Sequence, residues 1–471
     1  MGSVFKKENV SDDVLRQLIL KPKESFSSNR YNKIPHWKKV AVKEEEEENK
    51  KDLLFFIRNN DEIILPFFFA SQMTQKRSNF HLQHPNITFT FTENLYEIQD
   101  DIAKQALSEL SNKGTTILNL YTGSGKTVVG IYLAAKLQKL TLILVASLIL
   151  IPQWKTTLKD FSDATFWVVG EEPPPVAHVI ICMYTQFSKL PSEYVKNIGT
   201  VIIDEAHEFC TEKRINCLLG TTPQYVIAMT ATLERPDGMH SMIHLICGTE
   251  AIKKISKKPF NVFKYNTGIS VIFKNNKMGE PDWNDIKRKL TDDQIRNKQI
   301  IKIVTSNPSF KILILTWLVD HVTYLTQELI KVGENIDYMA GNKKSYSDSR
   351  ILIGTIDKIG TGFDEKTACA NFNGFRINML LLVGSIKSLG LLEQVAGRVF
   401  RSEFPQIIHF VDDMKIIENH WKQDQKWYKS RNGNIIEFNS EYYLEKQKEM
   451  MNKPTSPINA QLAFIQNQQK S

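Results

Sequence analysis

The sequence predicts two tandem α/β units, each built on a parallel sheet with helices over both of its faces. Short apolar runs rich in Val, Ile and Leu alternate with helical stretches, first between residues 91 and 250 and again after residue 308. Strands that are apolar throughout are typical of parallel sheets buried on both sides. The length of 471 residues also favours more than one core, because domains usually have roughly 100–200 residues.

Residues 1–90 are expected to form a small N-terminal accessory region. They contain an acidic run at 44–48 and an apolar, aromatic stretch, DEIILPFFFA, at 61–70. An acidic run is usually a solvated loop or helix face, so we assign it no chemistry. The apolar stretch and the residues after it, through Lys76 and Arg77, predict one or two strands that pack against the following unit.

The first α/β unit is predicted over residues 91–250. Five apolar runs are its expected strands: TTILNL (115–120), TLILVAS (141–147), VIICMY (179–184), TVIID (200–204) and YVIAMTAT (225–232). Between the first two runs, apolar residues recur at positions 129, 133, 137 and 140, which is helical spacing. The order strand, helix, strand is that of a parallel βαβ unit.

Residues 251–307 are interpreted as a linker and the start of the second unit. AIKKISKKPF at 251–260 interrupts the alternation with four lysines and a proline, and a hairpin and a helix around DWNDIKRKL are expected after it. The second unit is predicted over residues 308–430. Its expected strands are KILILTW (311–317), RILIGT (350–355), INMLLLVG (377–384) and QIIHFVD (406–412).

The chain after residue 412 predicts a helix followed by a polar, frayed C-terminal tail at 431–471. The helical part is IIENHWKQDQKWYKSR, and the residues beyond it are mostly Lys, Gln, Asn and Glu. Trp421, Trp427 and Tyr428 are expected to pack this segment onto the second unit. Stacking of these rings on nucleic-acid bases is the alternative, and it stays open at this point.

Composition and charge indicate a soluble, intracellular protein without a membrane partner. The start MGSVFKK lacks the apolar region of a secretory signal, and the longest apolar stretches fall short of the ~20 residues that cross a bilayer. The net charge of +8 is compatible with a polyanionic partner.

Five cysteines without a C-x-x-C pair predict buried free thiols rather than disulfides or a zinc site. His240 and His244 lack an H-E-x-x-H frame and are interpreted as structural.

A glycine-rich turn, YTGSGKT at 121–127, lies between the first predicted strand and the first predicted helix. Gly123 and Gly125 would let backbone N–H groups surround phosphate oxygens, helped by the dipole of the helix N-terminus. Lys126 would reach the β and γ phosphates, and the Thr127 hydroxyl would bind Mg²⁺. ATP and Mg²⁺ are therefore the expected ligands.

This loop departs from the usual phosphate-loop pattern because Leu120 stands where that pattern has glycine. The alternative is an ordinary turn between strand and helix with no special use. The strand before it and the helix after it favour a phosphate loop, in which Thr122 and Ser124 complete the expected nucleotide-binding set.

A pair of carboxylates, Asp204 and Glu205 in the tetrapeptide DEAH, follows the predicted strand TVIID. A carboxylate at the end of a strand beside a phosphate loop can hold Mg²⁺ through water, which is the role expected of Asp204. Glu205 would orient or deprotonate the attacking water. The tetrapeptide alone is common on protein surfaces, so the assignment depends on its position after a buried strand.

Four motifs in order, GSGKT, DEAH, TAT at 230–232 and QVAGRVFR at 394–401, resemble those of superfamily 2 helicases. The resemblance extends from about residue 95 to about residue 412. It implies two RecA-like domains that hydrolyse ATP with Mg²⁺ and move along nucleic acid. In the last motif it implies that Gln394, Arg398 and Arg401 act on ATP, with both arginines on one helical face and turned toward the γ phosphate.

The same resemblance assigns further residues. It implies that Gln99 reads the adenine ring and that Gly362 and Asp364, in RILIGTIDKIGTGFD, lie near ATP. Thr230 and Thr232 would couple the ATP carboxylates to the second unit. The remaining expected contacts are with the nucleic-acid backbone: Ser147 in VASLILIPQW, Tyr184 and Thr185 in MYTQF, and Thr355.

Several local features resemble the helicases of nucleocytoplasmic large DNA viruses, including poxvirus transcript-release helicases. They are the loop without its first glycine, QW at 153–154, RN at 296–297, and VDD followed by a helix with His420 and Tyr428. The resemblance implies a role in viral transcription, replication or repair, with transcription or replication proteins as partners. It also implies a location in the host cytoplasm and in the virion.

The expected function is an ATP-dependent helicase or translocase that contacts DNA or RNA mainly through phosphates and sugars, with a monomer favoured. One alternative is a duplex translocase or complex remodeller that does not separate strands. Another is a scaffold that binds nucleic acid without ATP turnover, which the intact Lys126, Asp204, Glu205, Arg398 and Arg401 disfavour. A restriction-complex motor is disfavoured because the chain has no second recognisable hydrolytic site.

Overall fold

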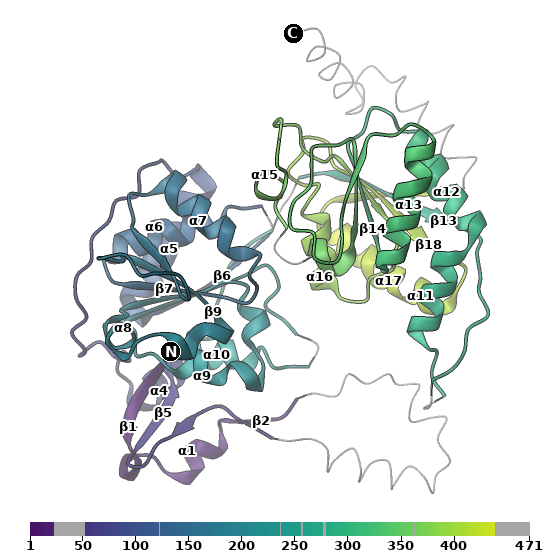
Figure 1. Ribbon diagram of the computed structural model, residues 1–471. Coiled ribbons are helices and arrows are strands. Elements are labelled where there is room, and N and C mark those ends of the chain that lie inside the picture. Colours follow the sequence, from purple (N-terminus) through teal and green to yellow (C-terminus); the bar gives the residue numbers. More distant parts are fainter. Residues whose placement is uncertain are drawn as a thin grey trace, which may run out of the picture. The chain divides into compact units, whose positions relative to one another are not determined.

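The computed structural model describes residues 1–22 and 52–438, except residues 122, 236, 256–257, 277–278 and 361–362. The chain divides into two compact units, Met1–Lys254 and Ile255–Ser471. Figure 1 gives the labels of the helices and strands in both units. The acidic run at 44–48 lies outside the described residues.

The first unit is built on a sheet of seven parallel strands in the order β12-β6-β11-β10-β7-β9-β8. All five predicted strands are present, and the short edge strands β8 and β12 were not predicted. The strands are β6 (Thr115–Leu120), β7 (Thr141–Val145), β8 (Phe166–Val168), β9 (Val179–Met183), β10 (Thr200–Ile203), β11 (Tyr225–Thr230) and β12 (Ile252–Lys254).

Helices cover both faces of this sheet, as Figure 1 shows, because successive apolar residues in each strand point to opposite sides. Val201 and Ile203 enter one core and Ile202 enters the other. The face of Ile202 is covered by α5 (Glu97–Lys113), α6 (Lys126–Leu137) and α7 (Leu150–Phe161). The opposite face is covered by α8 (Ser192–Asn197), α9 (Ile215–Leu219) and α10 (Ser241–Cys247).

The N-terminal accessory region packs onto the first unit. Its elements are β1 (Gly2–Lys6), α1 (Asp12–Arg16), β2 (Ile19–Leu20), β3 (Leu53–Leu54), β4 (Ile57–Arg58), β5 (Glu62–Pro66) and α4 (Phe67–Thr74). The expected strand stops at Pro66, so the prediction of strand beyond it is wrong. Phe67 and Ala70 are three residues apart and both buried, which is the spacing of a helix face, and α4 packs against α10 and β1. Phe68 lies against Gly248, where an added Cβ would be 3.2 Å from the ring.

The second unit repeats the architecture with a parallel sheet in the order β15-β16-β14-β17-β18-β13-β19. The four predicted strands are present, and three more accompany them. The strands are β13 (Phe260–Asn266), β14 (Ile312–Thr316), β15 (Ile336–Met339), β16 (Ile351–Thr355), β17 (Met379–Leu382), β18 (Gln406–Val411) and β19 (Gly433–Phe438). The presence of β19 corrects the expectation of a frayed end directly after residue 431.

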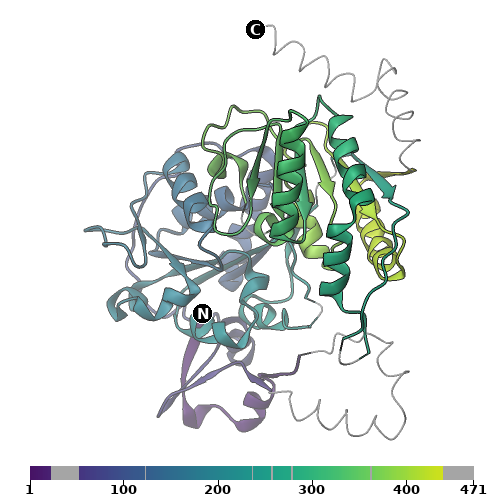
Figure 2. The same ribbon diagram turned by 45° about the vertical axis from the view of Figure 1, so that its right-hand side comes forward.

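The second sheet is also covered on both faces. Two helices, α12 (Gln294–Thr305) and α13 (Val319–Lys331), lie side by side on one face (Figures 1 and 2). The other face holds α11 (Trp283–Asp292), α14 (Ile356–Gly360), α16 (Leu389–Ala396) and α17 (Lys415–Ser430). On α17, Trp421, Trp427 and Tyr428 are buried in this core, as expected from packing rather than base stacking.

Two tandem RecA-like α/β units were therefore predicted correctly, with two local differences in the linker and tail. In the described part of residues 255–307, the expected hairpin is reduced to a short antiparallel turn, in which the Asn276 backbone N–H donates to the Glu280 carbonyl and that of Asp282 to the Lys274 carbonyl. The antiparallel contact there is a single bridge between Asn275 and Pro281. The longer strand of this region, β13, joins the large second sheet. All five cysteines are buried and free, and none of the described helices is long and apolar enough to cross a bilayer.

Candidate functional site

The glycine-rich loop joins the end of β6 to the start of α6. Gly123 and Gly125 have φ angles of 89° and 83°, a left-handed conformation that glycine adopts without strain. A Cβ on Gly125 would lie 2.2 Å from Nε2 of Gln99, so any other residue there would displace this amide. Leu120, which stands where the usual pattern has glycine, is buried at the end of β6. Thr122 lies outside the described residues.

Gln99 ties the N-terminus of α5 to this loop. Its Oε1 accepts a hydrogen bond from the Tyr96 backbone N–H at 3.1 Å, and its Nε2 donates to the Ser124 carbonyl at 3.3 Å. The side chain is buried, so it holds the loop in place. One N–H and one lone pair of the amide remain beyond these two bonds, where the resemblance implies a contact with adenine.

The other polar groups of the loop fit a phosphate and a metal ion. Nζ of Lys126 donates to the Leu120 carbonyl at 3.1 Å, and Oγ1 of Thr127 accepts from Nε2 of Gln153 at 3.3 Å. The Ser124 hydroxyl is buried and has no hydrogen-bond partner among the described residues. An unsatisfied buried hydroxyl beside a lysine is suited to an anionic ligand, because such a group is costly when it stays unpaired.

Asp204 and Glu205 follow β10, two strands from the loop in the same sheet. Oδ2 of Asp204 accepts a hydrogen bond from Nε1 of Trp154 at 2.8 Å, and Oδ1 accepts from the Glu205 backbone N–H at 3.0 Å. Burial, and then the charge of Glu205, raise the pKa of Asp204 to about 6, although Trp154 and Lys126 act in the opposite direction. The structure thus brings Lys126 and both carboxylates together.

Glu205 has a left-handed backbone, with φ 49° and ψ 54°. This conformation is uncommon for residues other than glycine and costs on the order of 1–2 kcal/mol. It turns the chain sharply between β10 and the 3₁₀ turn Ala206–Phe209. The strain therefore lies at the residue that the sequence assigns to the attacking water.

His207 connects the carboxylates to the Thr230 segment. Its Nδ1 lies 2.9 Å from Oγ1 of Thr230 and 3.5 Å from Oε2 of Glu205. Oγ1 of Thr230 also lies 2.9 Å from the carbonyl of Thr232 and accepts from its backbone N–H at 3.0 Å. Arg235 donates a hydrogen bond to the His207 carbonyl at 2.7 Å and so holds the backbone of His207 in place.

The predicted nucleic-acid residues of the first unit follow other strands of the same sheet. Ser147 comes after β7, where its Oγ accepts from the Ile149 backbone N–H at 3.4 Å. Tyr184 and Thr185 begin a 3₁₀ turn directly after β9, and the Arg214 guanidinium lies 4.2 Å from the Tyr184 ring centroid. Because the strands are parallel, these residues, the glycine loop and Asp204 share the carboxyl edge, where ligands bind in open α/β sheets.

In the second unit, Thr355 ends β16 and Asp364 caps α15 (Glu365–Ala368). Asp364 forms an ion pair with Arg401. Burial opposes ionisation of Asp364, but the charge and hydrogen bond of Arg401 outweigh it and hold the pKa of this carboxyl below its usual range. The guanidinium of Arg398 is buried and donates to the Gly360 carbonyl at 3.1 Å. Gly362 lies outside the described residues.

The two arginines do not lie on a helix, which corrects the sequence expectation. Gln394 is buried within α16, but that helix ends at Ala396 with Gly397 as its C-cap. Arg398 lies in the tight turn that follows, where its backbone N–H bonds to the Val395 carbonyl at 3.2 Å. Arg401 lies at the end of this turn and forms its ion pair with Asp364 of the same unit.

Sequence reasoning missed four residues of the first unit that contact the predicted site. They are Gln153 and Trp154 on α7, and His207 and Arg235 around the carboxylates. Gln153 and Trp154 were noted as a pair that viral helicases share, but no role was assigned to them. The spacing in sequence gives no sign that α7 brings them to Thr127 and Asp204.

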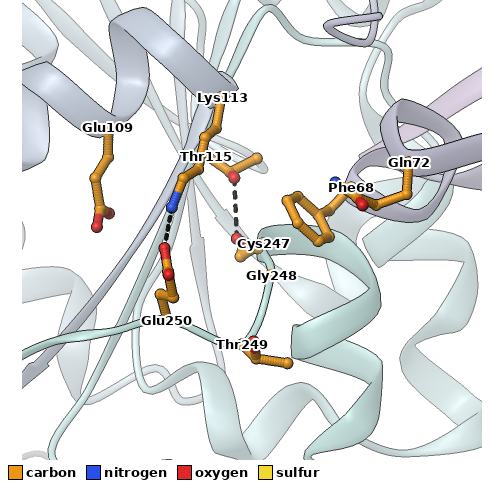
Figure 3. Close-up of a pocket in the computed structure, with 9 residues that line it drawn as sticks. All are labelled: Phe68, Gln72, Glu109, Lys113, Thr115, Cys247, Gly248, Thr249 and Glu250. Carbon is orange, nitrogen blue, oxygen red and sulfur yellow. Dashed lines mark hydrogen bonds and ion pairs between the residues drawn. The ribbon is translucent and has the colours of Figure 1, made fainter. Parts of the chain in front are cut away.

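A cavity of about 300 Å³ lies at the end of the first sheet where β6 begins, opposite the carboxyl edge that carries the glycine loop (Figure 3). Phe68 of α4, Lys113 of α5 and Glu250 line it, and Lys113 and Glu250 form an ion pair there. Thr115, the first residue of β6, also lines it, whereas the glycine loop follows the last residue of that strand. The cavity is therefore separate from the predicted nucleotide site.

Comparison with known sequences, like the motifs, finds similarity to helicases. Residues 92–235 match a family model described as "Type III restriction enzyme, res subunit". The chain is 28% identical over 381 residues to "Putative helicase 161L" of Invertebrate iridescent virus 6, covering 74% of this chain and 84% of that protein. It is 24% identical over 347 residues to "Transcript termination protein A18" of Yaba monkey tumor virus, covering 65% and 70% respectively.

Comparison with solved structures supports the fold. Dbp5 of S. cerevisiae, bound to RNA and ADP BeF3, aligns with a TM-score of 0.53 over 81% of this chain and 94% of Dbp5. The sequence identity is 14%, so this likeness concerns the architecture of two RecA-like domains alone.

Proposed function

Because this chain belongs to the superfamily 2 helicases, of the type found in nucleocytoplasmic large DNA viruses, we propose that it hydrolyses ATP to move along DNA or RNA or to unwind it. One observation carries this proposal. The carboxyl edge of the first sheet brings Lys126, the unsatisfied Ser124 hydroxyl and the buried Asp204 together around a glycine loop. A nucleotide with a divalent ion requires a cation and a hydrogen-bond donor for its phosphates and a carboxylate for the ion, and these three residues supply them.

In the proposed reaction, water attacks the γ phosphorus of ATP and the bond to the β–γ bridging oxygen breaks, giving ADP and phosphate. Glu205 orients this water and accepts its proton. Thr127 and, through water, Asp204 would hold Mg²⁺, which supplies neutralising charge at the phosphates when bound. Lys126 holds the β and γ phosphates. The hydrogen bond from Gln99 to the Ser124 carbonyl keeps the loop in its conformation.

The second unit would contribute Arg398 and Arg401, with Gln394, to the same triphosphate when the two units close on it. Closure would then depend on ATP, and hydrolysis would release it. The contacts from Glu205 to His207 and from His207 to Thr230 offer a physical route by which the state of the phosphates changes the backbone at Thr232. We assign coupling to these residues.

The nucleic-acid track would contact Ser147, Tyr184 and Thr185 in the first unit and Thr355 in the second. These groups suit phosphate and sugar contacts, so binding should be largely independent of sequence and should weaken as salt rises. The relatives named above are viral proteins, which supports a role in viral transcription, replication or repair within the host cell. Strand-displacement and triplex-displacement assays run side by side would separate unwinding from translocation on duplex.

The proposal is tested by measuring ATP hydrolysis with no nucleic acid, with single-stranded DNA and with single-stranded RNA at matched nucleotide concentration. We expect Mg²⁺-dependent hydrolysis that at least one of the two tracks stimulates. Stimulation by only one of them identifies the track. Absence of hydrolysis under all three conditions would contradict the proposal and favour a binding scaffold.

The raised pKa of Asp204 predicts an acid limit for activity. Protonation of this carboxyl removes its charge, so kcat/KM should fall as the pH drops through about 6. Trp154→Phe removes the N–H that stabilises the ionised form, so the midpoint should move upward by about one pH unit. Trp167→Phe is the matched control, because Nε1 of Trp167 donates to the Glu171 carbonyl instead. Equal pH profiles for the three proteins would contradict the assigned role of Asp204.

A further inference from the structure

Two tryptophans and a histidine gather in the second unit, and none of them belongs to the site described above. Trp317 directly follows β14, Trp283 begins α11, and His420 lies on α17. The rings meet edge to face, with centroids 5.7 Å apart for the two tryptophans and 5.6 Å apart for Trp283 and His420. Both indoles are only partly buried.

The cluster is held rigidly. Nε1 of Trp317 donates to the Ser385 carbonyl at 3.0 Å, and Nδ1 of His420 lies 2.6 Å from Oγ of the same serine. The indole can approach this closely because residue 384 is glycine. A Cβ on Gly384 would lie 3.0 Å from Nε1 of Trp317. Burial, and then the charge of Lys387, lower the pKa of His420, so its ring is neutral at pH 7.

The cluster lies beside the segment that we assign to the nucleic-acid backbone. Strands β16, β14 and β17 are neighbours in the parallel sheet, and Thr355, Trp317 and Ser385 stand at or just beyond their carboxyl ends. Gly384 is also in contact with Ile356, where an added Cβ would lie 2.6 Å from Cδ1. Gly384 thus lies between Trp317 and Ile356, and Ile356 directly follows Thr355.

Cationic side chains surround these rings. Nζ of Lys287 lies 5.9 Å from the Trp283 ring centroid, and Lys387 is exposed and close enough to His420 to affect its pKa. The Arg296 guanidinium lies 5.8 Å from the Trp317 ring, but it is fully buried and ion-paired with Asp412 at 2.8 Å, so it holds the ring in place and leaves phosphate contacts to Lys287 and Lys387. Aromatic faces flanked by cations bind single-stranded nucleic acid by stacking on bases and neutralising phosphates.

We propose that Trp283 and Trp317 form a platform that stacks on a base of the nucleic-acid strand held by the Thr355 segment. The inference rests on the proposed function and adds a contact with bases to the backbone contacts described above. Core packing alone is the competing account. Trp421 on the same face has 3% of its surface exposed, as a core residue should, whereas Trp283 and Trp317 are only partly buried and Trp283 has Lys287 beside its ring.

A track without bases tests the platform. Binding is measured by fluorescence anisotropy for a single-stranded oligonucleotide and for one of equal length with abasic sites throughout. The wild-type protein should prefer the strand with bases. Trp283→Leu and Trp317→Leu should each weaken binding of that strand by about 5- to 150-fold while changing abasic binding little. Trp283→Phe should retain most of the preference, since it keeps an aromatic face.

Tyr338→Leu is the matched control. Tyr338 is an aromatic residue of the second unit that is 40% exposed and has Lys343 over its ring at 4.1 Å, but it lies within the edge strand β15. Its removal should leave the preference for bases unchanged. Loss of affinity for both tracks to the same degree in Trp283→Leu and Trp317→Leu, or no loss in either, overturns the platform.

Crosslinking of the wild-type protein gives a second test that does not depend on variants folding. A strand carrying 5-iodouracil is irradiated in the complex, and the linked peptides are identified by mass spectrometry. Links to Trp283 or Trp317 are expected, and links confined to other residues overturn the proposal. Continued stimulation of ATP hydrolysis by nucleic acid in either case leaves the proposed function standing, whereas its absence in wild type removes both.

Discussion

Glu205→Gln should abolish nucleic-acid-stimulated ATP hydrolysis while ATP binding remains close to that of the wild type. An amide cannot accept a proton from water, and loss of a positioned general base costs about 10²- to 10⁴-fold in rate. Glutamine has nearly the shape of glutamate, so the left-handed turn at this residue and its contact with His207 should survive. Turnover is measured under saturating nucleic acid, and ATP affinity by titration with a fluorescent analogue.

Glu208→Gln is the natural control for this experiment. Glu208 lies on the same 3₁₀ turn, and its carboxylate is 3.5 Å from Nε2 of His207, while that of Glu205 is 3.5 Å from Nδ1. The two variants therefore make the same chemical change on opposite sides of one imidazole. Turnover in Glu208→Gln should remain within a few-fold of wild type. Equal losses in both variants would mean that charge around His207, rather than a base at Glu205, limits the reaction.

The strands that could be predicted from the sequence are the central ones, because burial on both faces makes them apolar throughout. β7 and β14 have every residue buried, and their sequences TLILV and ILILT show it directly. β13 was missed because FNVFKYN carries a lysine and two asparagines and follows a lysine-rich stretch, so the segment was interpreted as linker. β19 was missed because it lies at the edge of the sheet, where pairing with β13 rather than composition determines the strand.

The residues proposed for the nucleotide site could be predicted where they are adjacent in the chain and not where the fold assembles them. GSGKT and DEAH have local signatures that a turn or strand end requires. Trp154 is fifty residues from Asp204, and only the packing of α7 on the sheet brings its indole N–H to that carboxylate. The turn after Ala396 was not foreseen either, because QVAGRVFR has a helical pattern and Gly397 ends the helix inside it.

Arg398→Ala should reduce nucleic-acid-stimulated turnover by about 10³- to 10⁵-fold, the range found for arginines that neutralise a transferring phosphoryl group. Lysine should restore little of it, since it lacks the planar fork that binds phosphate oxygens in pairs. Arg288→Ala removes an exposed arginine from α11 of the same unit and should have no effect. A loss of less than tenfold in Arg398→Ala would exclude this arginine from the reaction.

A double variant asks whether the two units act on one triphosphate, which no single substitution can decide. Lys126→Ala should weaken ATP binding, while Arg398→Ala should lower turnover and leave binding nearly intact. If both side chains serve the same phosphates in one closed state, the double variant should lose far less than the product of the separate losses in kcat, because groups that act as a unit are not additive. Losses that multiply would mean that Arg398 acts at another place. In that case its buried contact with the Gly360 carbonyl would mark a structural arginine of the second unit.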